Sequence, residues 1–467
     1  MVNKIVLKMV LLSILIVLLS ISNPLFAQST FDIIPAVKIA SSPNPVGSGA
    51  RAQGMGSAFI GVADDATAAS WNPGGLMQLE TPECSIVYDY NYQDYHDDGT
   101  NNFEKINYLS AAYPFRIFNK NMIVSLNYQR LYDFYMPTLG FSQNYNFIYP
   151  DGKRFIFSQD IKYQQSGSLR AFAPAYAIQI TPRFSVGATF NIWTDDLAWD
   201  NGWNVSQEQK GSGIFRGNPV VTSLNIKEEY EDMEAFNSNI GFLWDITNLI
   251  TIGGVFKTPY KADFKHTYET RSSQIFPFLS PGYWSFNQLK YKEDFEMEFP
   301  MSCGLGMALR FSDNLTVGLD AYWTKWGQFL SSSKNRVKLE QFPPSWPPEP
   351  IAQPSGKKVS PIDGRTSDQG RNVHSTIQSH IGMEYLFILE KTIIPLRLGV
   401  FYDPEPSHKD PDDFWGVSAG SGLMFYNRII IDFAYIFRTG KDVKKDVAGF
   451  DMDIDQHKFM LSVIYHF

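Results

Sequence analysis

The feature that most constrains this chain is a repeated unit of two segments joined by a very short turn. Within each segment apolar and polar side chains alternate, which is the pattern of a β-strand with one apolar face. Asn, Asp, Ser and Pro occupy the turns, and these residues favour the backbone dihedrals of a hairpin. The turns lie at Thr181–Pro182, Thr247–Asn248, Ser312–Asp313 and Tyr426–Asn427, with looser copies at 119–120 and 390–391.

Long polar segments separate these hairpins, so short and long connections alternate along the chain. A transmembrane β-barrel has short turns at one end and long loops at the other, whereas a soluble β-sandwich has no such sorting. We therefore predict an all-β fold, a transmembrane antiparallel β-barrel of about 14 strands. Pro259 and Pro300 either kink or split long strands, and splitting would raise the number to about 16. The predicted loops are 93–102, 133–163, 200–229, 273–287, 331–371, 404–412 and 440–452.

Side-chain alternation within single strands supports a lipid face and a lumen face. Val186, Ala188 and Phe190 share one face of a strand whose other face carries polar residues. Near the C-terminus Asp432 lies opposite a row of Ile and Phe. The last strand alternates up to Phe467, and a terminal aromatic residue resembles the signal read during insertion of outer-membrane barrels.

The N-terminus predicts export. Lys4 and Lys8 precede an apolar run, 10–21, and Ala27 offers a cleavage site, so residues 1–27 read as a signal peptide. No later stretch has 18 consecutive apolar residues, which excludes a protein that spans the membrane with several helices. The predicted location is the outer membrane of a Gram-negative bacterium, surrounded by its lipid.

Bulk composition excludes several functions. The net charge of -8 argues against nucleic acid as a partner, which would need a basic face. The 15% aromatic content suits a barrel, whose girdles need amphipathic rings at both interfaces. Cys84 and Cys303 allow one disulfide at most, and the sequence leaves open whether they pair. The seven histidines never approach metal-ligand spacing, so no metal or other cofactor is expected.

The segment after the signal differs from the rest. Residues 47–76 consist mainly of Gly, Ala and Ser and cannot form a lipid-facing strand. The lumen of a barrel this wide is too large for wall side chains to fill, so we expect a compact plug there. The predicted organisation is a lead and lumenal hatch at 28–81 and the barrel at 82–467.

These residues resemble the FadL/TodX family of outer-membrane transporters for long-chain fatty acids and hydrocarbons. The likeness lies in Asp64 and Asp65 followed by Asn72, Pro73 and Gly74, where the family has an Asn-Pro-Ala element. It continues at 256–264, 315–326, 397–400 and 411–415, and so covers nearly the whole mature chain. The resemblance implies a hatch, capture of a hydrophobic ligand on extracellular loops, and exit through a gap in the barrel wall.

The sequence departs from the family pattern in three respects. Gly74 stands where the family has Ala, and the strand at 122–132 lacks the glycine that would kink the wall open. The stretch 29–48, with 49–52 after it, resembles instead FadL-like scaffold proteins of a secretion system. A barrel that serves as a secretion scaffold, and carries no lipid, is therefore the alternative function.

One predicted loop, 273–287, is unusually apolar, and exposed apolar patches mark binding sites. In the FadL/TodX family the corresponding loop forms part of the ligand-capture groove. Two tryptophans of the preceding long loop would form the other wall of that groove. The competing interpretation is that these side chains pack on each other or join the aromatic girdle. The residues are Ile275, Phe276, Phe278, Leu279, Tyr283, Trp284, Phe286, Trp199 and Trp203.

Motifs that would indicate enzymatic chemistry lack their structural context. Ser418 lies in a Gly-x-Ser-x-Gly pentapeptide, but a turn and a strand follow it instead of the required helix. Gly54-x-Gly56 lacks its third glycine, and Ser331-x-x-Lys334 lacks companion motifs. The favoured interpretation of Asp451, Asp453 and Asp455 is a solvated acidic strand end, and a divalent-cation site is the alternative. We predict no catalytic residue and no enzyme.

Asp64 and Asp65 in the hatch leave two interpretations open. Asp65 caps a short helix beginning at Ala66, or an inward carboxylate pairs with an arginine of the wall and steadies the plug. Together these patterns predict a monomeric barrel for passive transport of long-chain fatty acids or hydrocarbons through a plugged lumen. The sequence does not specify the ligand.

Overall fold

The computed structural model describes residues 47–94, 100–148, 152–215, 217–277, 283–344, 351–426, 428–445 and 450–467. The predicted signal peptide, 1–27, and the first part of the lead lie outside these residues. Strands dominate the described chain. Over the same ranges, no helix combines the length and the hydropathy that crossing a membrane requires.

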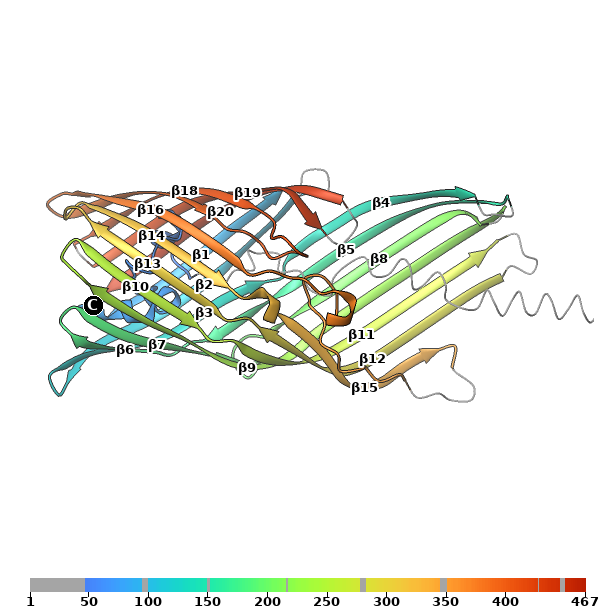
Figure 1. Cartoon of the computed structure of the whole chain (residues 1–467), viewed down its shortest axis with the longest axis horizontal. Helices are drawn as coiled ribbons and strands as arrows, with labels where there is room; N and C mark the ends of the chain where they lie inside the picture. Colours follow the sequence, from blue (N-terminus) through green and yellow to red (C-terminus); the bar gives the residue numbers. More distant parts are fainter. Residues whose placement is uncertain are drawn as a thin grey trace, which may run out of the picture.

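Short helices and long strands follow one another along the chain (Figure 1). The helices are α2 (Ala50–Gly54), α3 (Ala68–Trp71), η1 (Pro73–Gln78), η3 (Trp326–Gln328) and η4 (Ser367–Gln369). The first ten strands are β1 (Glu83–Asp94), β2 (Thr100–Ile117), β3 (Lys120–Asp133), β4 (Met136–Ile148), β5 (Arg154–Phe172), β6 (Ala175–Thr181), β7 (Phe184–Trp193), β8 (Gly202–Phe215), β9 (Asn218–Asp245) and β10 (Ile250–Lys257). The others are β11 (Tyr260–Phe276), β12 (Tyr283–Phe299), β13 (Ser302–Arg310), β14 (Leu315–Thr324), β15 (Leu330–Phe342), β16 (Thr376–Ile388), β17 (Thr392–Tyr402), β18 (Phe414–Phe425), β19 (Ile429–Lys445) and β20 (Phe450–His466).

Four strands are interrupted once each, at 173–174, 258–259, 300–301 and 325–329. Pro174, Pro259 and Pro300 stand at three of these breaks, because proline cannot donate a hydrogen bond to the ladder. Joining the halves turns the twenty segments of the described sheet into sixteen strands, where about fourteen were predicted. The two prolines named from the sequence therefore mark real interruptions.

The transmembrane antiparallel barrel is confirmed. Its pairings close through β1, β2, β3, β6, β7, β9, β10, β13, β14, β16, β17, β18, β19 and β20, and β20 returns to β1. We call this closed part the ring. β4 and β8 take no part in it, and they account for the difference between the expected and the observed strand number.

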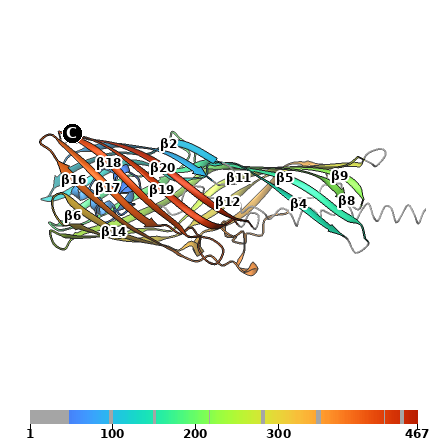
Figure 2. The same ribbon diagram turned by 90° about the horizontal axis from the view of Figure 1, so that it is seen from above.

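Beyond the ring a second sheet continues several of the same strands and projects from one end (Figures 1 and 2). It pairs β4, β5, β8, the first half of β9, β11, β12 and β15 in that order, and we call it the extension. Most of the predicted loops 133–163 and 200–229 is therefore strand, as are 273–276, 283–287 and 331–342 of two others. The prediction of loops is wrong at these residues, whereas 351–371 lies outside the named strands.

The outer face of the ring is apolar. Ile381, Leu398 and Val417 are each more than half exposed there, as expected where side chains meet lipid. On β11 the outward side chains are instead Lys261, Asp263 and Lys265, all exposed. Charged side chains in this number cannot face hydrocarbon, so the extension stands in water beyond the membrane.

Candidate functional site

Residues 47–79, which we call the insert, lie inside the ring (Figure 1). Almost every residue from 47 to 76 is buried, and α2, α3 and η1 are separated by tight turns. α2 packs on β17, β18, β19 and β20, whereas η1 packs on β6, β7 and β9. The insert thus touches opposite parts of the ring wall and blocks its lumen.

Glycines of the ring wall allow the backbone of the insert to approach closely. At Gly382 an added methyl group would overlap the carbonyl of Met55, and at Gly399 it would overlap the backbone of Gly56. Gly318 pairs with Gly382 and Gly382 with Gly399, so the glycines form a belt across neighbouring strands. Wall glycines that face the insert in this way are Gly187, Gly241, Gly253, Gly306, Gly318, Gly382, Gly399 and Gly420.

Polar wall side chains then bind the insert backbone. Ser418 Oγ donates to the Gly54 carbonyl at 3.0 Å and accepts from Gly56 N–H at 2.9 Å. One carboxylate oxygen of Asp320 accepts from the N–H groups of Phe59 and Ile60, at 2.6 and 2.7 Å. Ser418 is therefore fully occupied with the insert, which explains its position in a glycine-rich pentapeptide without any catalytic role.

Asn72, predicted as a hatch residue, ties two parts of the insert to the wall. Its Nδ2 donates to the carbonyls of Ile60 and Phe242, at 2.9 and 2.8 Å, and its Oδ1 accepts from Gly74 N–H at 3.1 Å. Pro73 begins η1, and its carbonyl lies against Gly187. A methyl group at Gly74 would meet the backbone of Phe242 at 2.7 Å, which gives a physical reason for glycine at this position.

A chain of ion pairs runs from the insert into the wall. Arg51 binds Asp64 at 2.6 Å and Glu384 of β16 at 2.8 Å. Glu384 also accepts from Arg397 of β17 at 2.6 Å. Arg397 in turn binds Asp432 of β19 at 2.6 Å. The three wall members are almost completely buried, so each depends on its neighbours to offset the loss of hydration.

The contacts of the two hatch aspartates differ from both interpretations, since the N-cap of α3 is Thr67 and not Asp65. Asp65 Oδ1 accepts from the N–H and the hydroxyl of Thr67, at 2.8 and 2.6 Å, immediately before α3 begins at Ala68. Asp64 pairs with Arg51 at 2.6 Å, and Asp65 lies 3.9 Å from the same side chain, so the arginine belongs to the insert itself. The connection to the wall passes through Glu384.

The lumen changes character above the insert, and the inward residues of β7 show the order. Ser185 and Thr189 donate to the insert carbonyls of Gly74 and Ala69, each at 2.8 Å. Asn191 then accepts from Gln129 of β3 at 2.6 Å, away from the insert. The last residue, Trp193, is buried among aromatic rings. A polar layer thus lies between the insert and an aromatic layer.

Ionic side chains of β1, β2, β3 and β20 belong to the polar layer. Lys105 binds Asp133 at 2.6 Å and approaches Asp89 at 4.0 Å. Arg130 binds Asp133 at 3.0 Å, and Lys458 lies 3.6 Å from Asp89. With three cations and two anions, this cluster presents a net positive charge to the lumen.

The aromatic layer lines the neck between ring and extension. Tyr260 stacks on Trp193 at 5.7 Å and on Phe299 at 4.6 Å between ring centroids. Farther out, Trp203 stacks on Tyr230 at 4.1 Å and on Phe134 at 4.7 Å. An interior of aromatic rings suits an apolar solute and is unlike the polar interior of a water-filled porin. The layer comprises Tyr132, Phe134, Trp193, Trp203, Tyr230, Tyr260, Phe264, Phe295, Phe299, Trp326 and Phe329.

A titratable cluster lies just beyond the aromatic layer, in the extension. His266 contacts Glu293 at 3.0 Å and Glu228 at 3.3 Å, and its ring stacks on Tyr230. Arg336 binds the second oxygen of Glu293 at 2.7 Å. Burial works against the charged imidazole, but the hydrogen bonds and charges of the two glutamates outweigh it, so the pKa of His266 is raised.

The predicted capture residues do not form one surface. On β11 and β12, Phe276 lies on the opposite face of the sheet from Ile275, Trp284 and Phe286. Phe276 is buried, whereas Trp284 is 66% exposed. Ile275 pairs with Val221 of β9. Trp203 pairs with Tyr230, which lies nine residues farther along β9. At 3.3 Å per residue the separation is about 30 Å. Phe278 and Leu279 lie outside the described residues, Tyr283 begins β12, and Trp199 packs edge-on against Tyr128.

The remaining motifs fall into structural roles. Ser331 and Lys334 lie on β15, and Gly54 ends α2. Cys84 on β1 and Cys303 on β13 are free thiols. In the ranges that the structure covers, no group of His, Cys, Asp and Glu has the arrangement of a metal site.

Several residues of the site are not singled out by the motifs above. Glu384, Arg397 and Asp320 each occupy the middle of a strand whose adjacent residues are apolar. A lone charge between two lipid-facing residues is the available signal, because in a barrel it must point into the lumen. The same signal marks Asp432, which the alternation pattern does identify.

β3, where the family resemblance implies a gap in the wall, is hydrogen-bonded on both sides. It pairs with β2 along one edge and with β6 and β5 along the other. Between those two partners, Ala173 N–H donates to the Asn127 carbonyl at 2.7 Å, and Asn127 Nδ2 donates back to the Ala173 carbonyl. The wall is therefore closed at this position.

Comparison with known proteins places these features in a family. A model described as outer membrane protein transport protein (OMPP1/FadL/TodX) matches residues 48–463. A FadL homologue of Pseudomonas aeruginosa has a TM-score of 0.54 at 15% identity, over 90% of this chain and 98% of its own. The CymD monoaromatic hydrocarbon channel has a TM-score of 0.51 at 15% identity, over 91% and 98%. None of the curated proteins matches the sequence. At these identities the structural likeness shows the fold.

Proposed function

Because this chain belongs to the outer membrane protein transport protein family (OMPP1/FadL/TodX), we propose that it carries long-chain fatty acids or hydrocarbons across the outer membrane, down their concentration gradient. Membership confirms the resemblance seen in the sequence. It also makes the protein an outer-membrane channel for hydrophobic compounds and not an enzyme. The chemical class of the solute, the passive mechanism and the route are the parts proposed.

The observation that carries the proposal is the aromatic layer. Trp193, Tyr260 and Phe299 stack inside the neck, between the extension and the insert, on the route that we propose for the solute. Transfer of apolar surface from water to such rings is worth about 25 cal/mol per Å². An alkyl chain or aromatic solute gains from this transfer, whereas an ion or a sugar loses its hydration.

The layers define a route of three steps. A solute first adsorbs at the distal rim of the extension, where Ile275, Phe276 and Trp284 are the proposed capture residues. It then moves between the rings of the aromatic layer and enters the polar layer. It leaves when the insert shifts, since the wall at β3 is closed.

The polar layer distinguishes fatty acids from hydrocarbons. A carboxylate that enters from the aromatic layer meets the net positive cluster of Lys105, Arg130 and Lys458, whereas a hydrocarbon gains nothing there. Removing Lys458 leaves Asp89 near Lys105, so the cluster loses one positive charge without leaving a carboxylate isolated. Lys458→Met should therefore slow fatty-acid uptake and leave alkane uptake unchanged.

The test is uptake of labelled palmitate and labelled hexadecane by cells that express the chain. Phe299→Ser places a hydroxyl within the stack and should lower uptake of both solutes at least fivefold. Val337→Ser, at an exposed position of β15 outside the lumen, is the matched control. Uptake no faster than in cells without the protein would reject the proposal.

A secretion scaffold is the second candidate, and the distal rim of the extension favours it. Outward apolar side chains lie on five neighbouring strands there and are 40–66% exposed. Ile156 pairs with Ile214, and Ile275 pairs with both Val221 and Trp284. This apolar row lies beyond the charged outward face, far from lipid, and suits a contact with another protein. Stoichiometric recovery of a secretion component from native membranes, lost in Ile214→Asp while palmitate uptake persists, would support the scaffold.

The remaining organisation is proposed on the sequence pattern. Residues 1–27 direct export and are removed, 28–81 form the lead and plug, and 82–467 form the barrel. Each chain works as a monomer, since the ring closes on itself through β1 and β20. Mass spectrometry of the purified protein tests the cleavage after Ala27, and native mass spectrometry tests the monomer.

A further inference from the structure

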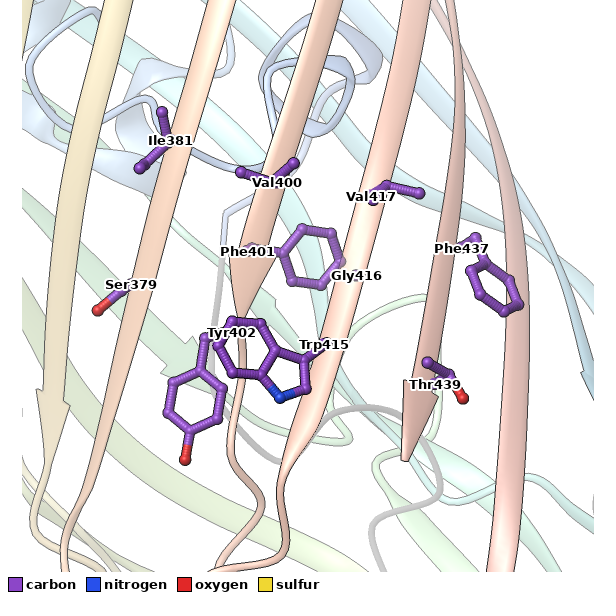
Figure 3. A pocket seen from close by; sticks show the side chains of 10 residues that line it. All are labelled: Ser379, Ile381, Val400, Phe401, Tyr402, Trp415, Gly416, Val417, Phe437 and Thr439. Carbon is purple, nitrogen blue, oxygen red and sulfur yellow. The ribbon is translucent and has the colours of Figure 1, made fainter. Parts of the chain in front are cut away.

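The outer face of the ring carries a hollow of about 480 Å³ across β16, β17, β18 and β19 (Figure 3). Its volume lies within the range of about 300–1,000 Å³ that is usual for small-molecule sites. Its lining is almost entirely apolar. The hollow does not open into the lumen described above, and it takes no part in the proposed route.

Two neighbouring rows of outward side chains shape the hollow. The row nearer the extracellular end pairs Tyr402 with Trp415, whose rings lie 4.7 Å apart and form its end wall. In the next row Val400 pairs with Val417, and these small side chains form the floor. The larger Ile381 and Phe437 flank the valines on the outer strands and form the side walls.

The floor is supported from inside by a single ring. Gly416 pairs with Phe401 between the two rows, and a methyl group at Gly416 would overlap the Phe401 ring. The ring therefore fills the space that a side chain at 416 would occupy. The floor is apolar on its outer side, and Ser379 and Thr439 are the small polar residues of the lining.

The surroundings identify what covers the hollow. Ile381, Val400 and Val417 are 51–52% exposed and continue the lipid-facing face of the ring. The end wall lies where β17 ends and β18 begins, next to the extracellular loop, and Tyr402 donates a hydrogen bond to Asp413 there. Tyr and Trp favour this interfacial level, which places the hollow in the outer leaflet.

We propose that this hollow is a binding site for one acyl chain of lipid A, the lipopolysaccharide anchor that forms the outer leaflet of this membrane. The chain lies over Val400 and Val417 between Ile381 and Phe437, and its headgroup end passes Trp415 and Tyr402. Phospholipid acyl chains offer similar apolar surface, but they belong to the inner leaflet and approach the ring from its other end.

The site backs directly onto the anchor of the insert. Gly399 and Ser418, the neighbours of Val400 and Val417 along the two strands, contact the insert on the inner face. A bound acyl chain therefore packs against the outside of the same two strands that hold the insert. It restrains their movement into the membrane without touching the lumen.

The experiment is native mass spectrometry of the full chain, extracted from outer membranes in a mild detergent. Bound lipid is identified by its fatty acids, because lipid A carries 3-hydroxyacyl chains and phospholipid does not. Val417→Trp fills the hollow with an apolar side chain that still suits lipid. Leu423→Trp adds the same side chain to an outward position of β18 outside the hollow and is the control. Retention of the folded band on an unheated gel shows that each variant forms its barrel.

The proposal predicts one retained lipid A per chain in the native protein and in Leu423→Trp. In Val417→Trp the retained fraction should fall at least fivefold. Three results would overturn it: retention of phospholipid alone, no retained lipid in the native chain, or equal retention in folded Val417→Trp.

Discussion

Arg51 provides the sharpest test of how the insert is held, because it joins the insert to the wall. Arg51→Met keeps the length of the side chain and removes its charge. The change breaks the pairs with Asp64 and Glu384, at 2.6 and 2.8 Å, and removes the charge that lies 3.9 Å from buried Asp65. Glu384 still has Arg397, so the wall itself is not left with an isolated charge.

The magnitude follows from the exposure of the partners. Asp64 is 26% exposed in its side chain and regains water when the pair breaks, whereas Glu384 is 4% exposed and does not. Hydrogen bonds to charged groups contribute about 1.5–3 kcal/mol each, and the rehydration of Asp64 reduces its share. The free energy of docking should therefore fall by about 3 kcal/mol, which raises the undocked population about 100-fold.

Conductance across a planar lipid bilayer measures that population, because an undocked insert opens the lumen to ions. Arg51→Met should open far more often than the native chain, and cells that express it should become sensitive to vancomycin. Arg183→Met is the control, since the Arg183 side chain donates to the Ile246 carbonyl and to Asn248 at a periplasmic turn, away from the insert. Glu384→Gln should also open the channel. The loss of docking free energy in the double variant should be smaller than the sum of the losses in the two single variants.

An open probability of folded Arg51→Met within threefold of the native value would refute this reasoning. The ion-pair chain would then contribute nothing to docking. Additive effects of Arg51→Met and Glu384→Gln would show instead that the two residues act separately.

Three further predictions follow from other contacts. Asn72→Ala removes the hydrogen bond to the wall carbonyl of Phe242 and two within the insert, and should weaken docking by about 1–3 kcal/mol, measured as increased protease cleavage within 47–79. Gly382→Val places side-chain atoms on the Met55 carbonyl and should give a folded barrel that conducts continuously in planar bilayers. The pKa of His266 is raised above the ordinary histidine pKa of 6.5. Below pH 6.5 its ion pairs with Glu228 and Glu293 therefore stabilise the extension fully. This stabilisation is lost as pH rises through the raised pKa. Hydrogen exchange of β11 and β12 should therefore speed up between pH 6 and pH 9 in the native chain beyond its intrinsic increase, and His266→Gln should abolish that step.

The ring was predictable from sequence because lipid imposes a period of two. Val186, Ala188 and Phe190 must be apolar outside, and their neighbours must suit the lumen, so the strand is visible in single residues. The hatch was predictable for a related reason, since its small residues suit close approach to a wall. Asn72 and Gly74 then appear at the points where that approach is closest.

The extension was missed because water bathes its outer face. β5, β8 and β9 carry mainly charged or polar residues outward, and inward Gln159, Gln165 and Gln209 interrupt the buried apolar residues, so the period of two is weaker than in the ring. Long strands then read as polar loops. The ion-pair chain was missed for another reason, since Arg51 and Glu384 lie 333 residues apart and become neighbours only when the ring closes around the insert.

The composition of the insert has a consequence for gating. Few of its side chains are large, with Met55, Phe59 and Trp71 the main exceptions, and the wall glycines remove the side chains that would pack against the rest. Apolar burial therefore contributes less to docking than in an ordinary core, where each large side chain is worth about 1.5–3 kcal/mol. Directional contacts of Asn72 and Arg51 contribute correspondingly more. Such contacts are lost over a displacement of about 1 Å, because hydrogen bonds weaken steeply beyond their normal length. The insert should thus occupy distinct docked and undocked positions, and a solute that competes for a few of these contacts is enough to move it.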